Sequence, residues 1–193
     1  VLAGGVELCT PGGGHAGPRA AIAAGLGYVP EDRKLQGLFF QLDIGENIVE
    51  PFMRRLAAAM GLRRLAAERD LIDERMRAFR IKAAGRGALP GSLSGGNQQK
   101  LLIARWMGPD TRVLLLDEPT RGIDVGTKAE VYRLVREAAD RGVAVVLVSS
   151  EMPELLALSD RIVVLSAGRL TGELRDEADM TQERILRLAT AGA

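Results

Sequence analysis

The sequence has very little of the residues on which metal and covalent chemistry depend. It contains one cysteine, Cys9, and one histidine, His15, among 193 residues. A single cysteine excludes an internal disulfide and fits a reducing compartment. A zinc site or a Ser–His–Asp triad would have to use His15. Because His15 lies in the loop-like stretch PGGGHAG, we expect it to be a solvated loop residue.

Long apolar runs and an excess of charge are also absent. No run reaches the roughly 18 apolar residues of a membrane-spanning helix. The formal net charge is +1 and aromatic residues make up 4%, so the composition does not indicate a nucleic-acid partner. Hydrophobic residues at 47% and charged residues at 26% are typical of a globular domain. The sequence starts at Val1, part-way into a pattern, and we expect it to be a piece of a longer polypeptide.

The first half of the sequence predicts short strands and a helical insert. Residues 1–30 indicate strands and turns, with a short helix near 18–24 and a strand at GLGYVP. Residues 51–88 are rich in Ala, Leu and Arg, with apolar residues at helical spacing. Within residues 51–90, ten Lys or Arg stand against four Asp or Glu. A solvated helical face is the simplest interpretation; contact with a membrane partner or an anionic lipid surface is the alternative.

From residue 93 onward, helices alternate with strands. Three continuous apolar runs, at 113–116, 143–148 and 162–165, are typical of parallel strands buried on both faces. Between the first two we expect an amphipathic helix over about 127–140. Its apolar face comprises Val131, Leu134, Val135 and Ala138. The alternation predicts an α/β fold with a parallel sheet, and Thr181 is a plausible cap for a terminal helix.

Two motifs carry the chemistry. LSGGNQQ (93–99) is a Ser-Gly-Gly turn that opens a helix, and the N–H groups at a helix N-terminus with a hydroxyl beside them can bind a phosphate. The strand at 113–116 runs into Asp117 and Glu118, at the strand end where ligands bind in open α/β sheets. One carboxylate can hold Mg²⁺ through water and the next can act as a general base. A capping or surface acid pair is the alternative, which the upstream motif disfavours.

Together these motifs resemble the ATP-binding cassette ATPases. LSGGNQQ resembles their signature motif, VLLLDEP their Walker B strand, and RGID (121–124) their D-loop. GYVPEDRK (27–34) and residues 147–174 narrow the resemblance. The narrower match is the C-terminal cassette of the fused ATPase subunits of bacterial simple-sugar importers, of the ribose, galactose and xylose type. The similarity covers nearly the whole chain.

The resemblance implies a fold and a two-cassette mechanism. Residues 1–193 would be a single cassette: an α/β ATPase core with a parallel sheet, a helical subdomain at 48–92 and a small β-rich N-terminal piece. Each ATP would lie between the P-loop of one cassette and the signature motif of the other. The P-loop pattern G-x-x-x-x-G-K-[ST] needs Gly before Lys. The four lysines instead follow Arg33, Ile81, Gln99 and Thr127. We therefore expect a chain truncated after its Walker A motif and inactive in isolation.

The resemblance also implies a nucleotide-contacting set, namely Ser94, Gly95, Gly96, Asn97, Gln98, Asp124, Glu31 and Ser150. The signature residues 94–98 would contact ATP held by the partner cassette, with Ser94 donating to the γ-phosphate. Asp117 would hold Mg²⁺ through water and Glu118 would be the general base.

Three further positions have implied roles. Asp124 would link the two ATP sites. Glu31 stands where most cassettes have a glutamine that touches Mg²⁺, and Ser150 stands where most have a switch histidine. Both changes weaken the site built on Asp117 and Glu118, so we expect the partner's site to do most of the hydrolysis.

The implied function is the energy-coupling domain of an importer for a sugar or similar small polar solute. Its cofactors would be ATP and Mg²⁺, and its partners a second cassette and a membrane permease. It would lie peripherally on the cytoplasmic face of the bacterial inner membrane, without nucleic acid. The alternative is a non-catalytic dimerisation or regulatory cassette with a degenerate ATP site. A DNA-repair ATPase would need a long coiled coil or a DNA-binding segment, which the sequence does not show.

Three weaker signals have simpler interpretations. GGGHAG (12–17) satisfies G-x-G-x-x-G, but Pro18 intervenes, which favours a flexible loop. Trp106 and Met107 have core-like spacing, and Tyr28 is expected in the core or at its rim.

Overall fold

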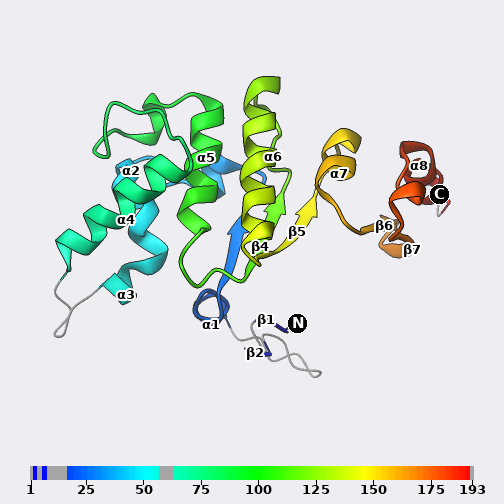
Figure 1. The fold of residues 1–193 in the computed structure, drawn as a ribbon, viewed down its shortest axis with the longest axis horizontal. Helices are drawn as coiled ribbons and strands as arrows, with labels where there is room; N and C mark the ends of the chain where they lie inside the picture. The colour runs from blue at the N-terminus through cyan, green and yellow to red at the C-terminus, as the bar shows by residue number, and fades with distance from the viewer. Residues whose placement is uncertain (1, 4–5, 8–16, 57–62, 192–193) are drawn as a thin grey trace. The chain divides into compact units, whose positions relative to one another are not determined.

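The computed structural model describes residues 2–3, 6–7, 17–56 and 63–191. Contacts divide the chain into two compact units, Val1–Val148 and Ser149–Ala193, whose elements are labelled in Figure 1. The expectations for Cys9, His15 and most of the loop at 12–17 lie outside the described residues.

A parallel three-stranded sheet forms the centre of the first unit. Its strands are β3 (Leu26–Val29), β4 (Val113–Asp117) and β5 (Ala144–Val148), in the order β3-β4-β5. Both pairings are parallel, with Val29 opposite Leu116 and Asp117 opposite Val148. Figure 1 shows the three strands side by side. The predicted α/β fold with a parallel sheet is confirmed.

The N-terminal elements are short, as the sequence indicated. Strand β1 (Leu2–Ala3) pairs antiparallel with β2 (Val6–Glu7), and helix α1 (Pro18–Ala23) contacts β3. A short π-helix, Arg33–Gly37, follows β3 and is capped by Asp32.

Two long helices pack against the sheet of this unit. Helix α5 (Gly95–Trp106) contacts β3, and helix α6 (Val125–Asp140) contacts β5 and α5. The residues of α6 that are buried are the four predicted from its period, Val131, Leu134, Val135 and Ala138. Met107, at the end of α5, is also buried, as expected for a core residue.

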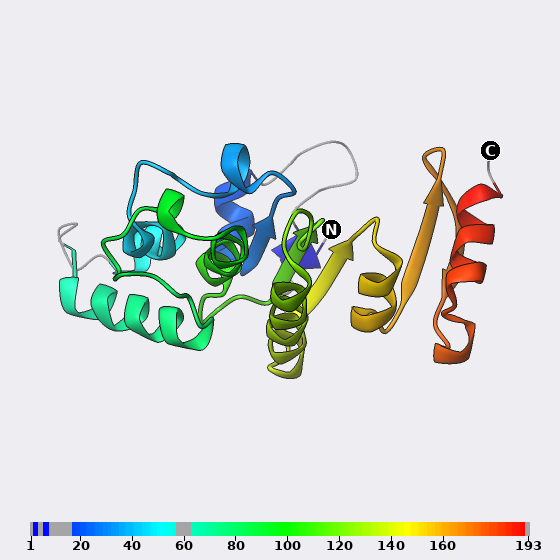
Figure 2. The same ribbon diagram turned by 90° about the horizontal axis from the view of Figure 1, so that it is seen from above.

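A group of helices at residues 44–92, which we call the helical lobe, packs against α5. Its elements are α2 (Ile44–Val49), a 3₁₀ turn (Glu50–Phe52), α3 (Met53–Leu56), α4 (Leu65–Ala78) and a 3₁₀ turn (Pro90–Ser92). Helix α2 contacts both α4 and α5, and Figure 2 shows this group from above. The predicted helical insert is therefore present, and the boundaries 48–92 for a subdomain stay a prediction.

Hydrogen bonds at the start of α2 explain how the lobe begins. Asp43 and Glu46 form a reciprocal capping box, with distances of 2.7 and 2.9 Å. Asn47 is fully buried, and its amide donates to the carbonyls of Phe39, Leu42 and Asp43. This asparagine therefore fixes the loop that leads into the lobe.

The second unit is a hairpin with helices. Its elements are α7 (Met152–Leu158), β6 (Ile162–Ser166), β7 (Arg169–Leu174), a 3₁₀ turn (Glu177–Asp179) and α8 (Gln182–Thr190). Helix α8 contacts β6 and β7, and Thr181 caps it, as expected. The core of this unit comprises Ile162, Val164, Leu174 and Ile185.

The prediction of a parallel, doubly buried strand at 162–165 was wrong. Strand β6 pairs antiparallel with β7. Its residues alternate between buried and exposed, and Leu165 is 67% exposed. Ala167 and Gly168 both have positive φ, 49° and 74°, as a two-residue hairpin turn requires. An apolar run does not specify the direction of the partner strand, whereas this turn does.

Strand β5 is also less buried than its apolar run predicted. Val146 and Val148 are 52% and 58% exposed. Exposed and half-buried residues alternate along β5, so one face of this strand is covered less than the other among the described residues. No helix of the described residues is both long and apolar enough to cross a membrane.

Candidate functional site

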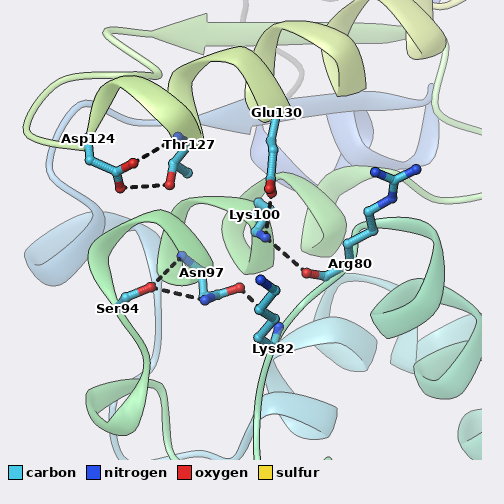
Figure 3. Close-up of polar contacts among 8 residues, drawn as sticks. All are labelled: Arg80, Lys82, Ser94, Asn97, Lys100, Asp124, Thr127 and Glu130. Carbon is cyan, nitrogen blue, oxygen red and sulfur yellow. Dashed lines mark hydrogen bonds and ion pairs between the residues drawn. The ribbon is translucent and has the colours of Figure 1, made fainter.

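The Ser-Gly-Gly turn opens a helix, as the sequence indicated, and its binding of phosphate stays a prediction. Ser94 is the N-cap of α5, and its Oγ accepts hydrogen bonds from the backbone N–H of Asn97 at 3.4 Å and from Asn97 Nδ2 at 3.0 Å (Figure 3). Ser94 is exposed and Gly95 is half-buried. The first N–H groups of a helix have no partner within it, so this end of α5 offers donors and a positive dipole to an anion.

The side chains of Asn97 and Gln98 are used inside the chain. Asn97 Oδ1 accepts a hydrogen bond from the backbone N–H of Lys82 at 3.0 Å. Gln98 is buried, and its Nε2 donates to the carbonyls of Pro90 and Leu93 at 3.1 and 3.2 Å. Both residues therefore shape the turn, and their contact with a nucleotide stays a prediction.

Asp124 lies at the start of α6, beside the same turn. Its carboxylate accepts hydrogen bonds from the N–H and the hydroxyl of Thr127 at 2.9 and 2.7 Å. These bonds lower the pKa of Asp124. A Cβ on Gly96 would stand 2.3 Å from Thr127 Cγ2, so only glycine fits there. Thr127, which the sequence analysis did not single out, thus joins the turn to Asp124.

The segment after β3 completes this cluster. Arg33 donates from Nε to Gln98 Oε1 at 3.3 Å and from Nη1 to the Arg121 carbonyl at 3.2 Å. Glu31 forms an ion pair with Arg121. The structure therefore brings the predicted Glu31 near the loop that leads to Asp124. Arg33 lies within the quoted stretch GYVPEDRK (27–34), but the sequence alone gave it no role.

Asp117 and Glu118 lie at the carboxyl end of β4, as predicted. The hydroxyl of Tyr28 donates to Asp117 Oδ2 at 3.3 Å, and partial burial and the Asp117 carboxylate raise the pKa of Tyr28. Tyr28 is 42% exposed, so it lies at the rim. Glu118 has a φ of 47°, which is uncommon for a residue other than glycine, and its N–H donates to the Val148 carbonyl at 2.9 Å.

This acid pair alone does not make a closed metal site. The described residues contain no group of three or more His, Cys, Asp or Glu placed to hold a metal. Mg²⁺ is commonly held by one or two carboxylates with phosphate oxygens and waters, and Asp117 fits that donor set once a phosphate is present. Ser150 belongs to the second unit, where it is exposed, and its role as a sensor stays a prediction.

A buried lysine ties α5 to its neighbours. The side chain of Lys100 is 4% exposed, and its Nζ lies 2.9 Å from both Glu130 Oε2 on α6 and the carbonyl of Arg80 (Figure 3). The hydrogen bond and the charge of Lys100 lower the pKa of Glu130. This contact holds α5, α6 and the end of the lobe together.

The Lys100–Glu130 pair predicts a dependence of stability on acid. Because the folded-state pKa of Glu130 is lowered, the pair stabilises the fold above the ordinary glutamate pKa of about 4.3, and this contribution is lost as the pH falls through the folded-state value. Glu130→Gln should therefore destabilise the protein at pH 7 and cost progressively less below pH ~4.3. Urea unfolding at several pH values measures this.

Glu137→Gln is the matched control for Glu130→Gln. Glu137 pairs with Arg133 on the exposed side of α6, and exposed pairs contribute little. An equal loss for Glu130→Gln at every pH would contradict the prediction.

Comparison with known families agrees with this geometry. The family model described as "ABC transporter" matches residues 13–121. The putative ribose/galactose/methyl galactoside import ATP-binding protein 1 of Rhizobium etli is 46% identical over 176 residues, covering 91% of this chain and 33% of that protein. The ribose import ATP-binding protein RbsA of Bacillus subtilis is 46% identical over 175 residues, covering 91% and 35%. The chain thus spans about a third of the length of these curated relatives.

Solved structures support the fold. A dimeric structure of MJ0796, a bacterial ABC transporter cassette, has a TM-score of 0.65 and 25% identity, covering 77% of this chain and 62% of that one. A dimeric post-hydrolysis state of the same cassette, bound to ADP and Pi, has a TM-score of 0.66 and 24% identity, covering 78% and 62%. The chain therefore has the cassette fold.

Proposed function

Because this chain belongs to the ABC transporter family, we propose that it is an ATP-hydrolysing, energy-coupling cassette of an importer for a sugar or similar small polar solute. Its relatives are named as ribose/galactose/methyl galactoside and ribose import ATP-binding proteins, which supports a sugar as the solute. The chain spans about a third of each relative, which supports a longer ATPase subunit. We propose that it is the C-terminal cassette of that subunit, on the resemblance of GYVPEDRK (27–34) and residues 147–174.

One observation carries this proposal. The capped N-terminus of α5 is exposed at Ser94, with Asp124 beside it, so its hydroxyl and first N–H groups can meet a phosphate that approaches from outside the chain. We propose that this phosphate belongs to an ATP that another cassette holds. The Ser94 hydroxyl, the first N–H groups and the dipole of α5 would then bind the γ-phosphate of the partner's ATP.

The carboxyl end of β4 supplies the acid–base chemistry of the chain's own site. Glu118 is positioned by its unusual backbone conformation and would accept the proton of the attacking water. Asp117, oriented by Tyr28, would hold Mg²⁺ through water. The metal would neutralise charge on the phosphate oxygens.

Two features weaken the chain's own site, which is built on Asp117 and Glu118. Glu31 is a carboxylate where most cassettes have a neutral amide, and a carboxylate repels the γ-phosphate. Ser150 cannot carry the charge of a histidine. The stronger site is therefore the one that Ser94 completes on the partner.

The proposed partners are a second cassette and a membrane permease, with the subunit bound peripherally to the cytoplasmic face of the bacterial inner membrane. We propose no nucleic-acid partner. Two exposed basic residues of the lobe are paired with acids, Arg63 with Glu68 and Arg86 with Asp73. This pairing favours a solvated face over one that binds phosphates.

Replacing Glu118 distinguishes this function from that of a non-catalytic regulatory cassette. In a full subunit whose N-terminal cassette has lost its general base, the remaining hydrolysis should come from the site of Glu118. Glu118→Gln should lower that remaining rate by about 10²-fold, the usual contribution of a general base. Phosphate release at saturating MgATP measures the rate.

Asp140→Asn, at the exposed end of α6, is the control for Glu118→Gln. If no hydrolysis remains in the background subunit, or if Glu118→Gln leaves the remaining rate unchanged, the cassette is regulatory. In either case the catalytic assignment of Glu118 is wrong.

A further inference from the structure

The hydroxyl of Ser94 is held in a defined hydrogen-bonding state. Two N–H donors of Asn97 point at Ser94 Oγ, at 3.4 and 3.0 Å. A serine oxygen has two acceptor positions and one proton. With both acceptor positions used, the proton is the only group that Ser94 can still offer.

The orientation of Asn97 is fixed in turn by the helical lobe. A backbone N–H can only donate, so the Asn97 atom facing Lys82 N at 3.0 Å must be the amide oxygen. The amide nitrogen therefore faces Ser94. The segment that carries Lys82 is itself anchored, because the buried Lys100 binds the Arg80 carbonyl at 2.9 Å and Ile81 is buried.

We infer that Asn97 is a positioning residue that sets Ser94 as a hydrogen-bond donor to phosphate, under the control of the lobe segment Arg80–Lys82. The inference rests on the proposed function, in which Ser94 binds the γ-phosphate of the partner's ATP. The bonds run in one direction, from Lys82 N–H to Asn97 Oδ1, from Asn97 Nδ2 to Ser94 Oγ, and from the Ser94 hydroxyl to phosphate (Figure 3).

The direction of these bonds gives the arrangement a function beyond capping. Bonds in such a chain polarise one another, which strengthens the last donor. If the segment Arg80–Lys82 moved away from α5, the amide of Asn97 would lose the bond that fixes its orientation. Ser94 could then point its proton at Asn97 instead of at phosphate. The lobe would thus be coupled to the ATP contact through two residues.

A double-mutant cycle in the full subunit tests this inference. Asn97→Leu removes the amide with little change of volume and adds no charge, and Ser94→Ala removes the hydroxyl. Each change alone should lower the rate of MgATP hydrolysis by about 10²-fold. If Asn97 acts through Ser94, adding Asn97→Leu to the Ser94→Ala variant should lower the rate of hydrolysis by less than about a further threefold.

Each outcome of the cycle has a distinct meaning. Independent losses that multiply to about 10⁴-fold would overturn the inference, because Asn97 would then act without Ser94. A wild-type rate for Asn97→Leu would also overturn it. A wild-type rate for Ser94→Ala would instead contradict the proposed function.

Asn97→Asp keeps the test decisive if Asn97→Leu fails to fold. The carboxylate still accepts from Lys82 N–H and is favourable in the first turn of a helix, so the urea midpoint should be unchanged or higher. It cannot donate to Ser94 Oγ and accepts its proton instead. We expect hydrolysis to fall by about 10²-fold in a stable protein. A stable Asn97→Asp variant with a wild-type rate would refute the inference.

Discussion

Replacing Ser94 with arginine should lower ATP hydrolysis by the full subunit by about 10³-fold, at the upper end of the effect of losing one preorganised donor. Ser94 is exposed at the N-terminus of α5, so the variant should fold. The long side chain fills the space where the phosphate of the partner's ATP would lie, and the cap of α5 is lost. Phosphate release at saturating MgATP measures the effect.

Two controls separate the loss of the phosphate contact from other effects of Ser94→Arg. Ala139→Arg adds the same charge at an exposed position of α6 and should leave the rate unchanged. Equilibrium binding of a fluorescent ATP analogue to the subunit should persist in Ser94→Arg, because the P-loop of the partner still holds the nucleotide. A wild-type hydrolysis rate in Ser94→Arg would show that the turn at Ser94 takes no part in hydrolysis.

Gly96→Ala should lower both the stability of the protein and the rate of ATP hydrolysis. The added Cβ would stand 2.3 Å from Thr127 Cγ2 and 2.7 Å from Thr127 Oγ1. The Thr127 side chain cannot turn away without breaking the hydrogen bond from its hydroxyl to Asp124. The start of α5 must therefore shift from α6, at a cost of about 1–3 kcal/mol. Urea unfolding measures the stability, and we expect at least a 10-fold slower hydrolysis.

Gly85→Ala is the matched control for Gly96→Ala. A Cβ on Gly85 would meet no atom within 4 Å, so the stability should change by less than about 0.5 kcal/mol. Thr127→Ser removes the methyl group nearest to the added Cβ and should recover part of the loss in the double variant. Equal stability of Gly96→Ala and Gly85→Ala would contradict the close packing of α5 on α6.

Features that depend on local sequence were predicted from the sequence. The period of the apolar residues placed the buried face of α6, since a helix repeats every 3.6 residues wherever it packs. Thr181 was expected as a cap, because a cap needs only its own helix, and a helix was expected to start at the Ser-Gly-Gly turn. The acid pair Asp117 and Glu118 was expected at a strand end, because it directly follows the apolar run at 113–116.

Features that depend on tertiary contacts were not predicted. The apolar run at 162–165 does not encode the direction of its partner, and the turn at Ala167 and Gly168 was overlooked. The backbone N–H of Lys82 reaches Asn97 only after the lobe has folded against α5. A backbone donor has no residue type, so no sequence motif could mark it.

The contact of Tyr28 with Asp117 shows the same limit. The two residues lie 89 positions apart and meet because β3 and β4 are adjacent in the sheet. The sequence placed Tyr28 only in the core or at the rim. The order of the strands in the sheet places Asp117 beside Tyr28.

The most direct test of the central claim is a calorimetric titration of MgATP into this chain, alone and then mixed with the N-terminal cassette of the same subunit. The claim is that the turn at Ser94 serves an ATP held by another cassette. It predicts no binding by the chain alone, and ATP-dependent association with hydrolysis in the mixture. Tight binding of MgATP by the chain alone that Ser94→Arg abolishes would contradict the claim, because the turn at Ser94 would then hold ATP without another cassette.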